Sequence, residues 1–228
     1  MAAPPDRARP ASDRVRVRRA PDRAAYDRAT IDAILDAALV AHIGFVVDGQ
    51  PYVIPVNHAR VGDDVLVHGS PASRAFRLLA AGDPVCLTVT LVDGLVLGRS
   101  AFHHSVDYRS VVLLGRGVPV TEPAAKLAAL EAFSERLVPG RWTEVRPPNP
   151  KELRATMVVR IAIDEASAKA RSGPPGDEPG DRALPTWAGA VPLALRAGAP
   201  VPAPDLAPGI EPSPAVLRLL ERFGSRSS

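Results

Sequence analysis

The chain has 228 residues, of which 46% are hydrophobic, and a formal net charge of +3 at pH 7. This length accommodates one well-buried domain with appendages, and the small net charge does not favour a nucleic-acid partner. The single cysteine, Cys86, excludes an intramolecular disulfide. We expect a cytoplasmic protein without a membrane partner, because no apolar run is long enough to span a bilayer and the N-terminus lacks a signal-peptide hydrophobic region.

Composition divides the chain into three parts. Residues 1–22 combine Pro, Ala and Asp with several arginines, which predicts a flexible basic arm. Residues 23–195 carry the periodic apolar segments of a folded domain. Residues 196–228 begin as a Pro-rich extension and end in a helical pattern, so we expect a short C-terminal helix that docks on the domain or on a second subunit.

The first half of the domain predicts a helix followed by strands. Apolar residues recur at helical spacing over residues 27–40, with Asp27 or Thr30 as the cap. We expect a hairpin around Asp-Gly, with strands over residues 42–47 and 52–56. Pro55 requires that the second strand lie at a sheet edge or contain a bulge.

A short strand over residues 65–67 then runs into a turn of small residues that opens a helix ending at Gly82. Ser70 stands where an N-cap is expected, with Pro71 at the first helical position and Ser73 and Arg74 just beyond. Backbone N–H groups, two hydroxyls and a cation would converge there, which favours a phosphate ligand. The alternative is a plain helix cap with a solvated arginine.

The second half of the domain repeats the pattern. Residues 84–91 and 95–101 predict a second hairpin around Val92-Asp93-Gly94, and residues 110–120 a long strand with a glycine bulge. A helix over residues 122–138, capped by Thr121, precedes a strand over 156–163 and a strand-like segment over 186–193.

About six strands joined by tight hairpins predict a mainly β, α+β domain built on a small antiparallel barrel with flanking helices. No GxGxxG or Walker-type loop indicates a parallel nucleotide-binding sheet, and no hydrolase constellation or metal site is expected.

Several of these segments resemble the pyridoxamine 5′-phosphate oxidase-like flavin-binding proteins, in the branch that includes nitroimidazole-resistance proteins. The resemblance covers residues 15–195 and is carried by the helix from Tyr26, the hairpin over 44–56, the segment His68–Arg74, and residues 108–111. It implies an antiparallel split β-barrel that forms a homodimer. It also implies that FMN lies in a groove between the subunits, with its phosphate near the strand-to-helix turn.

The same resemblance assigns residues to the cofactor. Ser73 and Arg74 match the Ser-Arg pair that holds the FMN phosphate, but Ala75 replaces a lysine, and residues around Asn57 and His58 replace basic residues of the oxidases. Pyridoxamine-phosphate oxidation is therefore not expected, and haem or a deazaflavin are the alternative cofactors. The full set of candidate cofactor-binding residues is Ser70, Ser73, Arg74, Asn57, His58, His68, Gly69, Ser110, Lys169 and Trp187.

A second cluster of chemically active residues is His103-His104. An imidazole beside a redox cofactor donates protons or orients substrate, and His103 is the candidate catalytic residue; the alternative is packing at an edge or interface. Lys169 alternates with Arg171 onto one strand face and would supply positive charge, unless both are solvated. Trp187 either covers the flavin from the partner subunit or packs in the barrel.

These observations give three functional hypotheses. The first is an FMN-dependent oxidoreductase acting on a small molecule such as a nitro-aromatic, with the electron chemistry supplied by the cofactor. The second is a non-catalytic module that binds flavin or haem for carrying or sensing. The third is a structural dimer that has lost cofactor binding.

Overall fold

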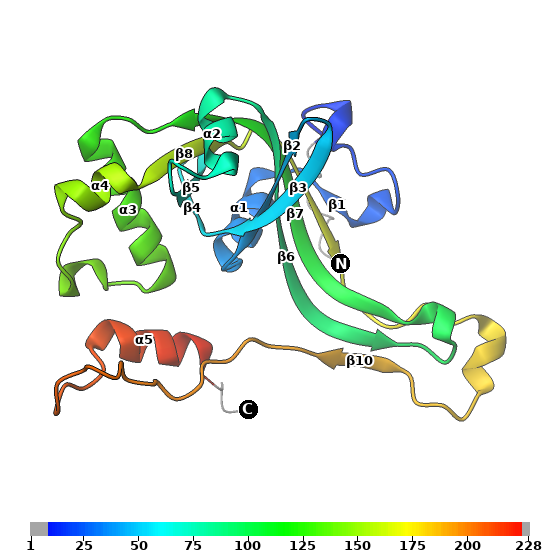
Figure 1. Cartoon of the computed structure of the whole chain (residues 1–228). Helices are drawn as coiled ribbons and strands as arrows, with labels where there is room; N and C mark the ends of the chain where they lie inside the picture. Colours follow the sequence, from blue (N-terminus) through cyan, green and yellow to red (C-terminus); the bar gives the residue numbers. More distant parts are fainter. Residues whose placement is uncertain (1–8, 225–228) are drawn as a thin grey trace.

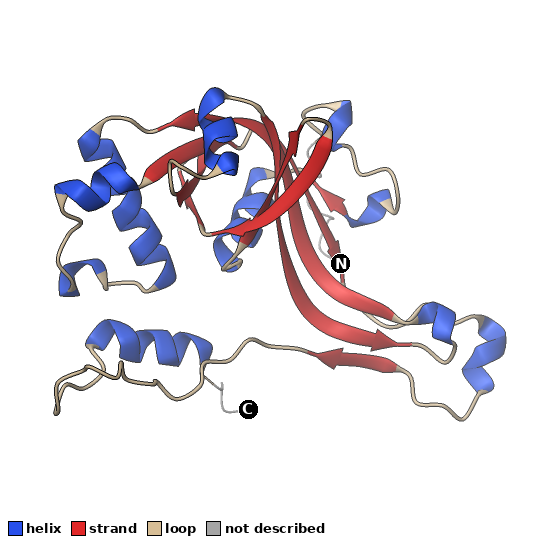
Figure 2. Cartoon of the chain, viewed as in Figure 1, coloured by secondary structure: helices blue, strands red, loops and turns tan. Residues whose placement is uncertain are grey.

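The structure is a computed structural model that describes residues 9–224 (Figure 1). That range contains ten strands and five α-helices (Figure 2). The strands are β1 (Ala24–Ala25), β2 (Ala41–Val47), β3 (Gln50–Val56), β4 (His58–Val61), β5 (Asp64–Gly69), β6 (Pro84–Leu97), β7 (Ser105–Pro119), β8 (Met157–Ala162), β9 (Glu165–Arg171) and β10 (Gly189–Pro192). The helices are α1 (Arg28–Ala37), α2 (Arg74–Ala81), α3 (Pro123–Leu137), α4 (Pro150–Ala155) and α5 (Pro214–Phe223).

The sheet is built around the long antiparallel pair β6–β7. Its main path runs β3-β2-β6-β7-β8-β5-β4, with β9 added to β7 and β10 added to β6. Strand β7 pairs with β9 as far as Leu114 and with β8 from Gly117 onward, so the sheet divides along this one strand. The path stays open at β3 and β4, which confirms the predicted split barrel and shows that it is not closed.

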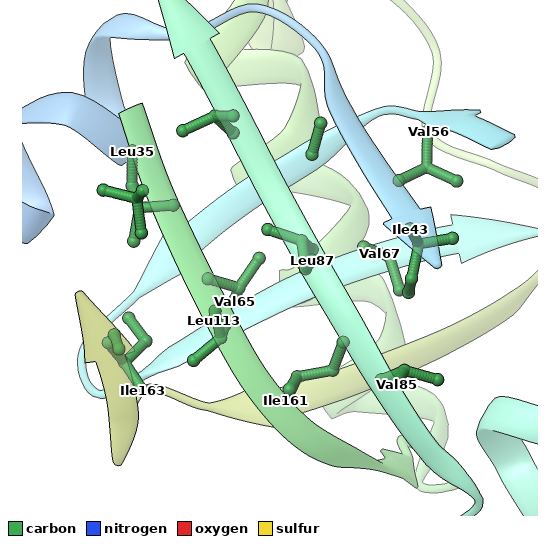
Figure 3. Close-up of a cluster of buried hydrophobic side chains, with 14 of the residues drawn as sticks. Leu35, Ile43, Val56, Val65, Val67, Val85, Leu87, Leu113, Ile161 and Ile163 are labelled. Atoms are coloured by element: carbon green, nitrogen blue, oxygen red, sulfur yellow. The ribbon is translucent and has the colours of Figure 1, made fainter. Parts of the chain in front are cut away.

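The core lies where the two parts of the divided sheet meet. Successive side chains of a strand point to opposite faces of the sheet. Leu87 of β6 and Leu113 of β7 are buried, whereas Val112, the neighbour of Leu113 on β7, faces the other way and is 37% exposed. Figure 3 shows side chains from β5, β6, β7 and β8 gathered in one apolar cluster. At the division, a Cβ on Gly117 would lie 2.3 Å from the Leu79 carbonyl oxygen of α2, so this close approach requires glycine.

Local signals in the first half of the domain are confirmed. Asp27 caps α1 by accepting a hydrogen bond from the Thr30 backbone N–H at 2.8 Å. Asp48 and Gly49 both have positive φ, as a two-residue hairpin turn requires, and Pro55 lies on β3 at the edge of the sheet.

The predicted hairpin around Val92-Asp93-Gly94 is wrong. Strand β6 continues from Pro84 to Leu97, and the register against β7 shifts between Val92 and Gly94, so Asp93 is the extra residue of a β-bulge. The Asp93 carboxylate accepts hydrogen bonds from Arg109 on β7, which holds the two strands together across the bulge. The glycine bulge predicted in β7 is not seen in its pairing with β6, whose register is regular from Arg116 to Tyr108.

The strand count also differs from the sequence-based estimate of about six. Strands β4 and β1 have only four and two residues, too short for a periodic signal. Helix α4, of six residues, was not predicted, although Asn149 and Glu152 form a capping box at its start. The cap of α3 is Glu122 rather than Thr121, because the Glu122 carboxylate accepts from the Ala125 N–H at 2.7 Å.

The described part of the predicted basic arm is anchored to the domain. Val15 is 4% exposed, and the Val17 backbone N–H donates to the Tyr26 hydroxyl at 2.8 Å. Val15 and Val17 therefore contact the domain, and the flexible basic arm over residues 1–22 stays a prediction. Residues 1–8 lie outside the described residues, and the boundaries at 22 and 195 stay a prediction.

The C-terminal segment crosses the molecule. Strand β10 pairs with β6, and the chain then extends to α5, which lies below α3 in Figure 1. Hydrogen bonds join the start of α5 to residues 141–144, which follow α3: the Ala215 N–H donates to the Glu144 carboxylate at 3.0 Å, and Arg141 donates to the hydroxyl of Ser213, the N-cap residue of α5, at 3.0 Å. No helix within residues 9–224 has the length and hydrophobicity needed to cross a bilayer.

Candidate functional site

The predicted anion site lies where β5 ends and α2 begins. Ser73, not Ser70, is the N-cap residue of α2, and its side chain makes no capping hydrogen bond. Ser70 and Pro71 belong to the preceding turn, in which the Ser73 N–H donates to the Ser70 carbonyl at 3.0 Å. The Ser73 hydroxyl is therefore available beside the first turn of the helix.

Arg74 is exposed at the first position of α2. Its guanidinium lies over the Tyr52 ring at 4.1 Å from the centroid, and that ring is stacked in turn on Phe45. A cation–π contact orients the guanidinium without neutralising it, so its positive charge remains available to an anion. The N-terminal end of α2 adds favourable partial charge at the same place.

A cavity of about 390 Å³ opens between β3, the end of β5 and α2. Asn57 and His68, two of the predicted residues, lie in its wall with Phe76 of α2. Gly69 allows this arrangement, since a Cβ there would lie 2.4 Å from the Phe76 ring. The remaining lining residues are apolar or proline: Val40, Ile54, Pro55 and Val56.

His68 is the half-buried imidazole of this cavity. It contacts the Phe133 ring edge-on, with 4.4 Å between ring centroids. Burial lowers the pKa of His68, so the ring is held neutral and retains one donor and one acceptor nitrogen. A neutral, oriented imidazole at a cavity wall is suited to hydrogen bonding with a bound ligand.

His58 does not join that cavity. It is 2% exposed, and its Nε2 lies 3.0 Å from the Leu35 carbonyl oxygen, so Nε2 carries the proton. Its Nδ1 has no hydrogen-bond partner among the described residues. Burial, followed by the charge of Arg136, lowers the pKa of His58. The structure therefore makes His58 a core group between α1 and α3.

We expect His58 to make stability depend on pH. The folded protein keeps His58 neutral, whereas the unfolded chain binds a proton there below about pH 6.5. Its contribution is present above that pH and is lost as the pH falls. The free energy of unfolding of a His58→Gln variant, measured by urea denaturation from about pH 7 to about pH 5, should decline less steeply than that of the wild type. His104→Gln, at an exposed histidine, is the control, and equal slopes for wild type and His58→Gln would contradict the argument.

Ser110 and Lys169 lie next to each other, and neither lies near Arg74 at the start of α2. They are cross-strand partners on β7 and β9, and the Ser110 hydroxyl donates to the Lys169 carbonyl at 3.2 Å. Neither residue lines the cavity that holds His68. Within one chain these two predicted residues are therefore separate from Arg74.

His103 and Trp187 lie at the far end of the β6–β7 arm. His103 belongs to the turn Ala101–His103 that joins the two strands, and its Nε2 is 3.9 Å from the Glu178 carboxylate. Trp187, which precedes β10, is 64% exposed. Figure 1 places this arm away from α2, so one chain alone does not bring either residue to the start of that helix.

A larger groove of about 560 Å³, which the sequence did not indicate, lies between the α1–β2 connection, β6, β7 and the segment that follows β10. His42 of β2 and Arg109 of β7 are among the residues that line it. Hydrogen bonds to Asp93 at 2.8 and 2.7 Å raise the pKa of Arg109. Val40 lines both this groove and the His68 cavity. Within residues 9–224 no group of three or more His, Cys, Asp or Glu side chains could hold a metal ion.

Comparison with known proteins agrees with this geometry. Residues 27–170 match the sequence profile of the family described as pyridoxamine 5'-phosphate oxidase. The flavocytochrome Anf3 from Azotobacter vinelandii is 42% identical, with a TM-score of 0.86 over 92% of this chain and 97% of that one. A FAD and heme binding protein from Mycobacterium smegmatis is 39% identical, with a TM-score of 0.83 over 86% of this chain and 97% of that one.

A more distant structure shares the fold alone. It is a candidate 5-nitroimidazole antibiotic resistance protein from Bacteroides thetaiotaomicron, 22% identical, with a TM-score of 0.53 over 64% of this chain and 85% of that one. No curated protein matches the chain. The profile covers more than half of the residues, and two solved structures are well above 30% identical over most of the chain. The chain belongs to the pyridoxamine 5'-phosphate oxidase family.

Proposed function

We propose that this protein binds a flavin nucleotide and carries out redox chemistry with it. The observation that carries the proposal is the 42% identity to a flavocytochrome over 92% of the chain, combined with an uncompensated cation at the start of α2. FMN is the flavin that the sequence motifs favour, and FAD is the one named for the Mycobacterium smegmatis relative. Both carry a phosphate and an isoalloxazine ring.

The residues at the α2 corner fit such a ligand. Arg74 and the Ser73 hydroxyl would hold the phosphate, together with the N–H groups of the first helical turn. The adjoining cavity offers apolar walls from Ile54, Val56 and Phe76 to the ring system, and His68 offers a hydrogen bond. A bound flavin supplies one- or two-electron transfer. The chain supplies the anion site, the orientation and the exclusion of water.

We propose that two copies associate through the outer face of β2 and β3. Val46 and Val53 on this face are 58% and 66% exposed. A second copy packed against this face would bury these valines of both copies at once. Such a dimer would also allow the arm that carries Trp187 and His103 to approach the cavity of the partner. Size-exclusion chromatography with light scattering tests this, and a monomer at micromolar concentration would contradict it.

The reaction would be electron transfer to a small molecule, with a nitro-aromatic as the first substrate to try. A second candidate is a module that carries flavin and haem without turnover, which the similarity to a flavocytochrome favours. Oxidation of NADPH in the presence of a nitro-aromatic separates the two.

The decisive experiment is identification of the chromophore. The full chain is purified without added cofactor, its absorption spectrum is recorded, and the chromophore released by denaturation is identified by mass as FMN, FAD or a deazaflavin. We expect a flavin spectrum, and a Soret band in addition if haem is bound. A colourless protein that also fails to bind added FMN and FAD would overturn the proposal and favour a dimer that has lost its cofactor.

A further inference from the structure

The arm formed by β6, β7 and β10 has one covered face and one open face. Figure 1 shows it projecting from the barrel. Val96 of β6 is fully buried on the covered face. Gly98 points the same way, and a Cβ there would lie 2.8 Å from the carboxylate of Asp177 in the segment that returns from β9 to β10. Asp177 fixes this segment by accepting hydrogen bonds from the Arg99 backbone N–H at 2.8 Å and from its guanidinium at 2.7 Å.

Apolar side chains make up the open face. Val191 of β10 is the cross-strand partner of Leu95 on β6, and Leu95 is the partner of Val106 on β7. Partners in a ladder point to the same side of the sheet, and these three are 42%, 43% and 38% exposed. The Trp187 ring lies on that side too, since a Cβ on Gly189 would lie 3.0 Å from it. We call Leu95, Val106, Trp187 and Val191 the arm face.

The arm face carries no charge. Towards the barrel it continues with Val92 and Tyr108, which are cross-strand partners. Asp107 alternates with Val106 and Tyr108 along β7, so it points to the other side, where it forms an ion pair with Arg171. An uncharged apolar face is complementary to itself, because two copies meet across it without like charges.

The arm face and the outer face of β2 and β3 belong to one side of the sheet. Val112 points to the same side of β7 as Val106, because even-numbered residues alternate with the buried Val111 and Leu113. The row from Val112 runs through Thr88 of β6 to His42 of β2, on the side that carries Val46. A stable dimer buries about 800 Å² on each partner, which is more than two valines provide. The arm face supplies the additional apolar surface.

The order of these surfaces along the sheet indicates how two copies are arranged. A two-fold axis across the strands of the arm makes the two arms antiparallel, so the Trp187 end of each arm points to the β2–β3 face of the other copy. An axis parallel to the strands would instead bring the two barrels together at β7 and β9, where the 3-10 turn Asp13–Val15 already lies.

We infer that the arm face is an interface for a second copy of this chain, with the two arms antiparallel and Trp187 of each copy on the β2–β3 face of the other. The inference rests on the dimer of the proposed function. It adds the larger part of the interface and a partner residue beside β3, the strand whose residues Ile54, Pro55 and Val56 line the cavity assigned to the flavin.

The first test is the stability of the dimer, measured on the full chain by sedimentation equilibrium. We expect Leu95→Glu to raise the dissociation constant of the dimer at least about 100-fold, because a carboxylate from each copy would be buried without a partner. Val191→Glu, on the edge strand β10, should act in the same way, and circular dichroism checks that both variants are folded. The matched control is Val118→Glu, at a 45% exposed valine near the other end of β7, which should leave the dimer unchanged.

The second test locates the arm on the partner. In a Cys86→Ser background, a chain with Trp187→Cys and Val46→Cys is treated with a short bismaleimide. We expect covalent dimers, which peptide mapping should assign to Cys–Cys links between positions 187 and 46 of different copies. A chain with Val118→Cys and Val46→Cys is the control and should give no such link.

The outcomes separate this inference from the proposed function. A dimer that is as stable with Leu95→Glu and Val191→Glu as in the wild type would overturn the inference, and so would the absence of links between positions 187 and 46 of different copies. Flavin content is measured on the same samples, so flavin binding stands or falls independently. A wild-type chain that binds flavin as a monomer at micromolar concentration would overturn the inference together with the proposed dimer.

Discussion

Replacing Arg74 by alanine is expected to weaken flavin binding by about 1.5–3 kcal/mol, or roughly 10- to 150-fold in the dissociation constant. The guanidinium is the cation at the start of α2, and its contact with Tyr52 leaves its charge uncompensated. Charge-assisted hydrogen bonds to a phosphate are about twice as strong as neutral ones, so their loss outweighs that of the neighbouring hydroxyls. Fluorescence titration of the cofactor-free protein with FMN and with FAD measures the change.

Arg77→Ala is the matched control for that experiment. Arg77 is an exposed arginine of the same helix, one turn beyond Arg74, and its loss removes the same net charge. We expect Arg77→Ala to change the affinity for flavin little. Arg74→Lys should retain only part of that affinity, because an ammonium group lacks the bidentate donor geometry of a guanidinium. Equal effects of the Arg74 and Arg77 substitutions would reduce the role of Arg74 to general electrostatics.

Leu113→Ala is expected to lower the free energy of unfolding by about 2–5 kcal/mol. Leu113 is fully buried in β7, opposite Leu87 on β6 and Ala166 on β9, and lies within the cluster drawn in Figure 3. Its truncation would leave a cavity at the centre of the divided sheet, where the surrounding strands are held in register by pairing on both sides. Urea denaturation measures the effect.

The adjacent residue supplies the comparison for this prediction. Val112 is on the same strand but faces outward and is 37% exposed, so Val112→Ala should change the free energy of unfolding much less. A small effect for Leu113→Ala, or a similar effect for both variants, would mean that the buried cluster does not carry the stability of the domain.

Local signals that depend on one or two residues were readable from the sequence. The start of α1 at Asp27 or Thr30, the Asp48-Gly49 turn and an edge or a bulge at Pro55 each follow from side-chain or backbone chemistry that acts within a few residues, and the structure selects Asp27 and the edge. The prediction of a hairpin turn at Asp93-Gly94 was wrong, because the same Asp-Gly pair forms a β-bulge there. A turn and a bulge both need an irregular backbone, and only the pairing of the next strand decides between them.

The candidate site divides in the same way. The Ser73–Arg74 segment is contiguous in sequence, so local spacing was enough to predict its place at the start of a helix. The observed N-cap residue is Ser73, whereas the sequence predicted Ser70. His58 was grouped with the ligand-binding residues but lies in the core, because a strand of four residues gives too little pattern to show which face is buried.

The sequence by itself determined the class of fold and the position of Ser73 and Arg74 at the start of a helix, since hairpin turns and helix caps act over short distances along the chain. The tertiary structure alone decided how β7 divides its pairing between β9 and β8, and which histidines meet a cavity. It also built the larger groove from residues of β2, β6, β7 and the C-terminal segment. Residues far apart in sequence are brought together there by burial of the core and by strand pairing, and no local pattern records either.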